Sequence, residues 1–171
     1  MIARDLETNF LFELQRQYPK DEIRLPGYEE KCYKINLSTR TIDSPEFLSI
    51  EKDHNSEVKY FVIDRYFDHK DLSTVACIIQ YENAKGDQFV YPVPFFDTYT
   101  LRDENRMIIP WNISGNVSVY AGEIKYSFRF FEFARDEETN ELLPELVYNL
   151  NTLQATSKIL HGLDVSMEVN D

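Results

Sequence analysis

The spacing of hydrophobic residues changes after the first 27 positions of the chain. Between Asp5 and Tyr18 apolar side chains recur at helical intervals on one face, at Leu6, Phe10, Leu11, Leu14 and Tyr18. Pro19 and Pro26-Gly27 end this pattern. The spacing predicts an N-terminal amphipathic helical arm within residues 1–27. Its apolar face, the candidate interface, packs either on its own domain or on a neighbouring subunit; a disordered arm is the third alternative.

From residue 28 to residue 165 the pattern is that of short strands separated by turns. Alternation is clearest over Glu123–Phe133, where one face carries Ile124, Tyr126, Phe128 and Phe130, followed by Glu132. Further strands are expected at 32–37, 47–50, 57–64, 73–81, 88–96, 106–112 and 146–150. Strands at this spacing predict a mainly β domain, an Ig-like antiparallel β-sandwich over residues 28–165. The polar residues 166–171 are expected to form a flexible tail.

Turn residues refine this prediction at three places. The polar loop that contains Gly86 predicts a hairpin, since glycine adopts a positive φ without strain. Pro92 and Pro94 cannot donate to a strand ladder, so the returning strand is expected at a sheet edge. Residues 155–161, followed by Gly162, are expected to form one helical turn. Trp111 is expected to fill the core rather than to anchor an interface.

Composition and charge exclude several classes of partner. Twelve Phe and eleven Tyr against five Gly favour a sheet protein with a large core. The net charge of −12, without a cluster of Lys or Arg, argues against nucleic acid. No export signal or long apolar run is present, so no membrane span is expected. Cys32 and Cys77 could pair, but without export they are expected to be buried thiols.

Residue types that carry chemistry do not form a recognisable motif. Asp64, Asp68 and Asp71 could hold a cation or act as an acid/base pair. Because basic residues are interleaved, a tight loop with Asx turns and local ion pairs is favoured. None of the histidines has zinc-site spacing: His54, His69 and His161. The acidic run at 136–141 is expected to be a solvated hairpin loop. We therefore expect no catalytic residue, no cofactor and no metal site.

Several phrases resemble a known family, in a fixed order over residues 59–165. They are Tyr60–Asp68, Asp71–Ser73, Ile79–Gly86, Trp111, Ala121–Phe130, Tyr148–Thr152 and Ile159–Asp164. In this order they resemble structural proteins of tailed bacteriophages, and the domain is similar to the N-terminal domain of siphophage upper baseplate proteins of Gram-positive hosts. The resemblance implies a β-sandwich that assembles into multimers and catalyses no reaction.

The expected function follows from that resemblance. It implies a phage virion structural protein, an adaptor in the tail, baseplate or neck, assembled in the host cytoplasm. Its partners would be other virion proteins and copies of itself in a homo-oligomer. One alternative is a capsid decoration protein. Another is a module that binds host-surface carbohydrate through exposed aromatic side chains, for which the candidates are Tyr91, Phe95, Phe96, Tyr99 and Tyr120.

Overall fold

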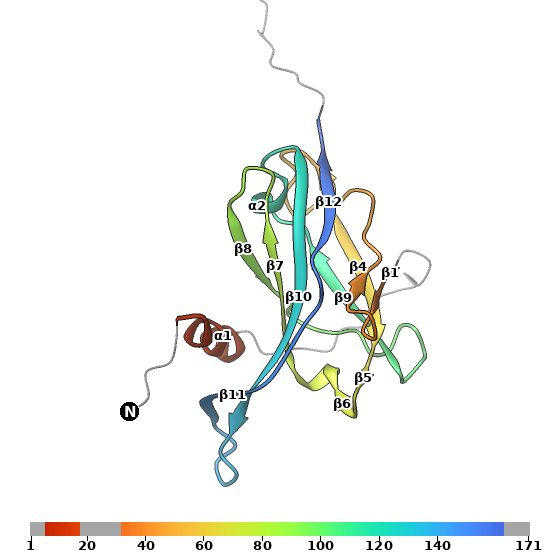
Figure 1. Cartoon of the computed structure of the whole chain (residues 1–171). Helices are drawn as coiled ribbons and strands as arrows, with labels where there is room; N and C mark the ends of the chain where they lie inside the picture. The colour runs from red at the N-terminus through yellow and green to blue at the C-terminus, as the bar shows by residue number, and fades with distance from the viewer. Residues whose placement is uncertain (1–5, 18–31, 163–171) are drawn as a thin grey trace, which may run out of the picture.

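The computed structural model of the chain describes residues 6–17 and 32–162. About half of the chain is strand, and the strands form two main sheets that face each other like the layers of a sandwich (Figure 1). None of the helices in the described residues is long and apolar enough to span a membrane. The predicted tail at 166–171 and the segment 18–31 lie outside the described residues.

The smaller sheet has four strands in the order β2-β1-β4-β9. These are β1 (Cys32–Asn36), β2 (Thr41–Ile42), β4 (Val58–Asp64) and β9 (Arg106–Asn112). Strands β4 and β9 run antiparallel, with Phe61 opposite Ile109 near the middle. Both are rich in β-branched and aromatic residues, which pack well on a pleated surface.

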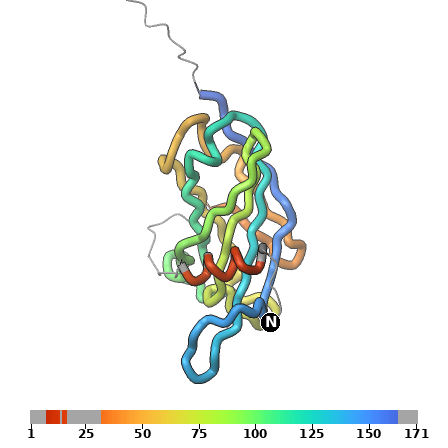
Figure 2. The backbone as a smooth tube through the Cα atoms, turned by 90° about the vertical axis from the view of Figure 1, so that its left-hand side faces the viewer, coloured from red at the N-terminus to blue at the C-terminus, as the bar shows by residue number. Residues whose placement is uncertain are grey.

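The larger sheet has the order β3-β12-β10-β7-β8, and β11 pairs with the far end of β10. Its strands are β3 (Ser49–Ile50), β7 (Ala76–Glu82), β8 (Gln88–Pro92), β10 (Gly122–Arg135), β11 (Leu142–Asn151) and β12 (Ala155–Leu160). Because β10 outruns its neighbours, its last residues and β11 form a hairpin that projects beyond the rest of the sheet (Figure 2).

Short elements connect the two sheets. Strand β4 leads into a small hairpin of β5 (Tyr66–Phe67) and β6 (Lys70–Asp71), followed by the 3-10 turn η2 (Leu72–Thr74). After β9 comes the short helix α2 (Gly115–Ser118). The N-terminal helix α1 (Leu6–Gln17) lies across the outer face of the larger sheet (Figure 2).

The core between the sheets is built largely from aromatic rings. Phe61 of β4 lies with its ring centroid 4.9 Å from that of Phe128 and 6.1 Å from that of Tyr126, both on β10. Trp111 is fully buried against Tyr126 at 5.2 Å, which confirms its predicted place in the core. The four alternating residues of β10 that were predicted to share one face all point into this core.

The hairpin around Gly86 is confirmed. Gly86 has a φ of 96°, and β7 and β8 on either side of the loop pair antiparallel. Strand β8 ends at Pro92 and lies at the end of the sheet order, as the prolines predicted. Cys77 is buried in the core, whereas Cys32 is only half-buried.

Two fold predictions are wrong. The sheets are not purely antiparallel, because β1 pairs parallel with β4 and β3 pairs parallel with β12. Both added strands are short and lie toward the sheet margins, where a long connection can bring a strand back in either direction. Residues 155–160 form a strand rather than a helical turn. Ala155, Ser157 and Ile159 are buried alternately, and pairing with β10 over Gly122–Tyr126 overrides the local helical signal.

Substitution of Phe61 tests the contact between the sheets. Phe61→Ala leaves a cavity among four other aromatic rings, so the free energy of unfolding should fall by about 3–5 kcal/mol. Val58→Ala, at an exposed position of the same strand, should change it by less than about 0.5 kcal/mol. Urea denaturation followed by Trp111 fluorescence measures both. Equal effects of the two substitutions would contradict a core centred on Phe61.

Candidate interaction site

Helix α1 packs on its own domain. Leu11 is 1% exposed and lies in a small apolar cluster with Ile78, Phe131 and Phe133 on the outer face of the larger sheet. Phe12 packs edge-on against Phe133, with ring centroids 5.3 Å apart. The helix therefore covers an apolar patch that the sheet would otherwise expose.

This packing buries one of the predicted interface residues and leaves another exposed. Leu11 is covered by the domain itself, whereas Phe10 is 48% exposed on the other side of the helix. The side chains of Leu6 and Leu14, and Tyr18 as a whole, lie outside the described residues. Docking on a neighbouring subunit stays a prediction, which in the described part of the helix concerns Phe10.

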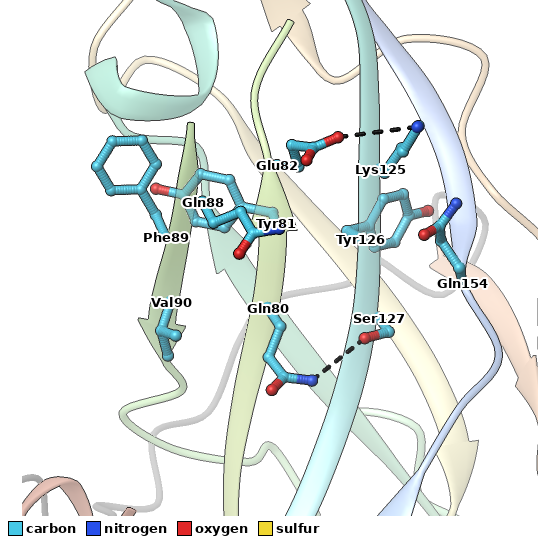
Figure 3. A pocket seen from close by; sticks show the side chains of 10 residues that line it. All are labelled: Gln80, Tyr81, Glu82, Gln88, Phe89, Val90, Lys125, Tyr126, Ser127 and Gln154. Atoms are coloured by element: carbon cyan, nitrogen blue, oxygen red, sulfur yellow. Dashed lines mark hydrogen bonds and ion pairs between the residues drawn. The ribbon is translucent and has the colours of Figure 1, made fainter. Parts of the chain in front are cut away.

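A shallow depression of about 430 Å³ lies on the same outer face, across β8, β7 and β10 and beside the loop that precedes β12 (Figure 3). Gln80 Nε2 donates to Ser127 Oγ at 3.4 Å, and Lys125 Nζ lies 3.8 Å from Glu82 Oε2. The side chains that line it come from outward-facing strand positions and from the loop before β12, and they include Gln80, Glu82, Gln88, Lys125, Ser127 and Gln154. The depression therefore offers hydrogen-bonding groups from side-chain amides and a hydroxyl. It carries no net charge, because Glu82 and Lys125 neutralise each other.

The tyrosines beneath this depression belong to the core. Burial raises the pKa of Tyr126, whose hydroxyl lies 2.6 Å from Ser44 Oγ. Burial also raises the pKa of Tyr81, against hydrogen bonds from Ser114 and Asn116 that lower it. Both phenols stay protonated at neutral pH, so their role is in packing and hydrogen bonding.

The aromatic residues proposed for carbohydrate binding do not form one rim. Phe96 is buried, and its ring packs against Phe130 in the core. Tyr91 and Phe95 are half-buried. Tyr99 and Tyr120 are exposed, but Tyr99 precedes β9 and Tyr120 follows α2 beyond the other end of that strand. No common aromatic platform results from these five.

Of the three aspartates at 64–71, Asp64 ends strand β4 and lies outside the turn, whereas Asp71 makes the predicted Asx-type turn and ion pair. Asp71 accepts hydrogen bonds from Arg65 Nε at 3.1 Å and from the Ser73 N–H at 3.0 Å, and it caps η2. Burial by itself raises the pKa of Asp71, but these hydrogen bonds outweigh it, so the pKa lies below its usual value. Asp68 has a φ of 50° in the β5–β6 turn.

Residues that could hold a metal ion are not brought together in the described part of the chain. Within residues 6–17 and 32–162 no three His, Cys, Asp or Glu side chains are grouped for metal binding. His54 instead accepts a hydrogen bond from the Gly115 N–H at its Nδ1, at 2.7 Å, where α2 begins.

Sequence reasoning did not find the depression. The polar residues of β7 and β10 alternate with core residues, which is the ordinary pattern of an exposed sheet face. Gln154 lies in a loop, and only the pairing of β12 with β10 brings it beside that face. One feature of the sequence does bear on the depression: β8, which forms one side of it, contains no charged residue.

No protein-family model matches the chain, and no curated protein matches it.

Substitution of Leu11 tests whether α1 contributes to the stability of its own domain. Leu11→Ala should lower the free energy of unfolding by about 2 kcal/mol, near the low end for a buried leucine because the cluster is small. Phe10→Ala, the exposed neighbour, should change it by less than about 0.5 kcal/mol. Urea denaturation of both variants gives the comparison. No loss on Leu11→Ala would contradict packing of the helix on its own sheet.

The carboxylate of Asp71 gives a pH-dependent prediction. Asp71→Asn should lower the free energy of unfolding by about 1 kcal/mol at pH 7. Because the folded-state pKa is depressed, this stabilisation is present above the unfolded-state pKa of about 4 and is lost as the pH falls below it. Urea titrations should show a smaller difference in the free energy of unfolding between the wild type and Asp71→Asn at pH 3 than at pH 7. Asp68→Asn is the control, and an equal loss for Asp71→Asn at both pH values would contradict the carboxylate's role.

Proposed function

We propose that the chain is a non-catalytic structural protein of a tailed-phage virion, an adaptor in the tail, baseplate or neck. The ordered resemblance over residues 59–165 supports this proposal, together with a mainly β, sandwich-like domain. Its partners are other virion proteins and copies of itself, and it works through protein–protein contacts. We also propose that the sandwich is of the Ig-like type. It differs from a purely antiparallel one in the parallel pairing of β1 with β4 and of β3 with β12.

The observation that carries the proposal is the projecting hairpin of β10 and β11. It extends beyond the body of the domain, where a neighbouring protein can contact it from several sides (Figure 1). Val147, at 52%, and Leu153, at 58%, leave apolar surface exposed on and just after β11. In this proposal Val147, on the hairpin itself, contacts a neighbouring protein that buries its apolar side chain.

Helix α1 supplies a second contact element in this proposal. Its covered side, with Leu11 and Phe12, holds it on the larger sheet. Phe10 on the opposite side stays open to a neighbour, so the helix acts as an arm without leaving its own domain. Aromatic side chains contribute strongly where they become buried in an interface.

Particle incorporation tests the proposed function. Particles of the phage whose genome encodes the chain are purified by density gradient and probed with an antibody to the protein. We expect a fixed copy number per particle. A stop codon in the gene should leave incomplete tails, and the protein supplied from a plasmid should restore infectivity. Protein found only outside particles, or full infectivity without it, would contradict the proposal.

Substitutions in the hairpin refine that experiment. In the complementation assay Val147→Asp should lower incorporation at least about tenfold, because a charge placed at a buried contact lacks a partner. Val58→Asp places the same charge on an exposed valine of β4 and should be incorporated normally. Circular dichroism of both purified variants confirms that they fold. Specific binding of the isolated protein to host glycans would instead support the carbohydrate-binding alternative.

A further inference from the structure

Strand β8 forms an open and regular edge of the larger sheet. It pairs with β7 from Gln88 opposite Glu82 to Pro92 opposite Ile78, without a register shift. No other strand in the described residues pairs with its outer edge, and Figure 1 shows β8 at the margin of the sheet. Within the described residues the outer edge of β8 therefore has no strand partner.

The geometry of the hairpin identifies the backbone groups of this edge. Two hydrogen bonds bracket β8: Asn83 N–H to Asp87 O at 2.9 Å, and Val93 N–H to Cys77 O at 3.0 Å. Bonded and non-bonded positions alternate along an antiparallel pair, so Phe89 and Tyr91 face β7. The N–H and C=O groups of Gln88 and Val90 consequently point away from the sheet.

Other sheet edges of the described chain are protected against strand addition. Strand β11 contains Pro144 and an exposed Glu145, and its register with β10 shifts twice. The edge of β9 is bridged at Ile108 by Asp97, and β2 and β3 contain two residues each. Proline, charge, bulges and short length are the devices by which proteins blunt exposed edges. Strand β8 lacks charge and bulges, and its proline lies at its last residue.

Charge indicates which partner fits this edge. The chain carries −12, so two copies repel each other wherever their carboxylates meet. The face beside β8 is neutral, since Gln80, Gln88 and Ser127 are uncharged and Glu82 is compensated by Lys125. A neutral edge gives no attraction to a charged peptide, but it lets two copies approach without repulsion.

We infer that β8 pairs antiparallel with β8 of a second copy and joins the two larger sheets into one continuous sheet. Around a two-fold axis the arrangement is self-complementary, because each copy offers the N–H and C=O groups of Gln88 and Val90 to the same groups of the other. This inference deepens the proposed assembly role and rests on it for its setting in the particle.

A proline substitution tests the pairing on the full-length protein. The N–H of Gln88 faces away from β7, so Gln88→Pro removes an intermolecular hydrogen bond and no bond of the hairpin. Gln88→Ala keeps the N–H and is the matched control. In sedimentation velocity the wild type should dimerise with rising concentration, Gln88→Pro should dimerise about tenfold more weakly, and Gln88→Ala should stay within about twofold of the wild type.

Amide hydrogen exchange of the wild type gives an independent measurement. Exchange at Gln88 and Val90 should slow as the protein concentration rises, while exchange at Val147 on β11 should not change. A wild type that is monomeric at every concentration overturns the inference, and so does a Gln88→Pro variant that dimerises normally. Slow exchange at Gln88 and Val90 that does not depend on protein concentration would mean that another segment of the same chain covers this edge. That result would also overturn the inference.

The two proposals can fail separately. Dimerisation is measured on the isolated protein, whereas particle incorporation is measured on virions. A protein that is incorporated into particles but does not dimerise through β8 refutes this inference alone. A protein that dimerises but is absent from particles refutes the proposed function and leaves the β8 contact in place.

Discussion

The packing of Phe61 against Phe128 is the contact on which the rest of the structure depends. Each main sheet turns an apolar face toward the other, and neither of these faces is stable in water unless the other covers it. The two rings meet at 4.9 Å, and Trp111 and Tyr126 pack around them. Because this cluster fixes how the sheets lie against each other, it also fixes which sheet faces and edges remain at the surface.

Strand β10 explains why the domain needs its N-terminal helix. Over its first half β10 buries one face, with Tyr126 in the core and Lys125 outside. Further along, Phe130 lies in the core while Phe131 and Phe133 lie on the opposite face, where Leu11 and Phe12 of α1 cover them. A helix with one apolar face is the simplest cover for such a patch. The same packing leaves Phe10 on the outside.

The surface combines strong charge with local neutrality. The projecting hairpin is acidic at its tip and irregular along its edge, features that oppose indiscriminate strand pairing. Strand β8 contains no charged residue, and in the depression beside it the charge of Glu82 is compensated by Lys125. In a protein with a net charge of −12, a neutral and regular edge is where self-association meets the least electrostatic opposition. Assembly through defined contacts is therefore consistent with both kinds of surface.

The sequence by itself determined most strands, the hairpin at Gly86, the edge position of β8 and the burial of Trp111, because alternation, glycine and proline act locally. Tertiary structure alone decided that β1 and β3 pair parallel, that residues 155–160 form a strand, and that α1 covers Phe133. It also brought Gln154 beside Ser127. Alternation states which side of a strand is apolar but not which strand lies next to it, since partners are chosen by contacts between residues far apart in the chain.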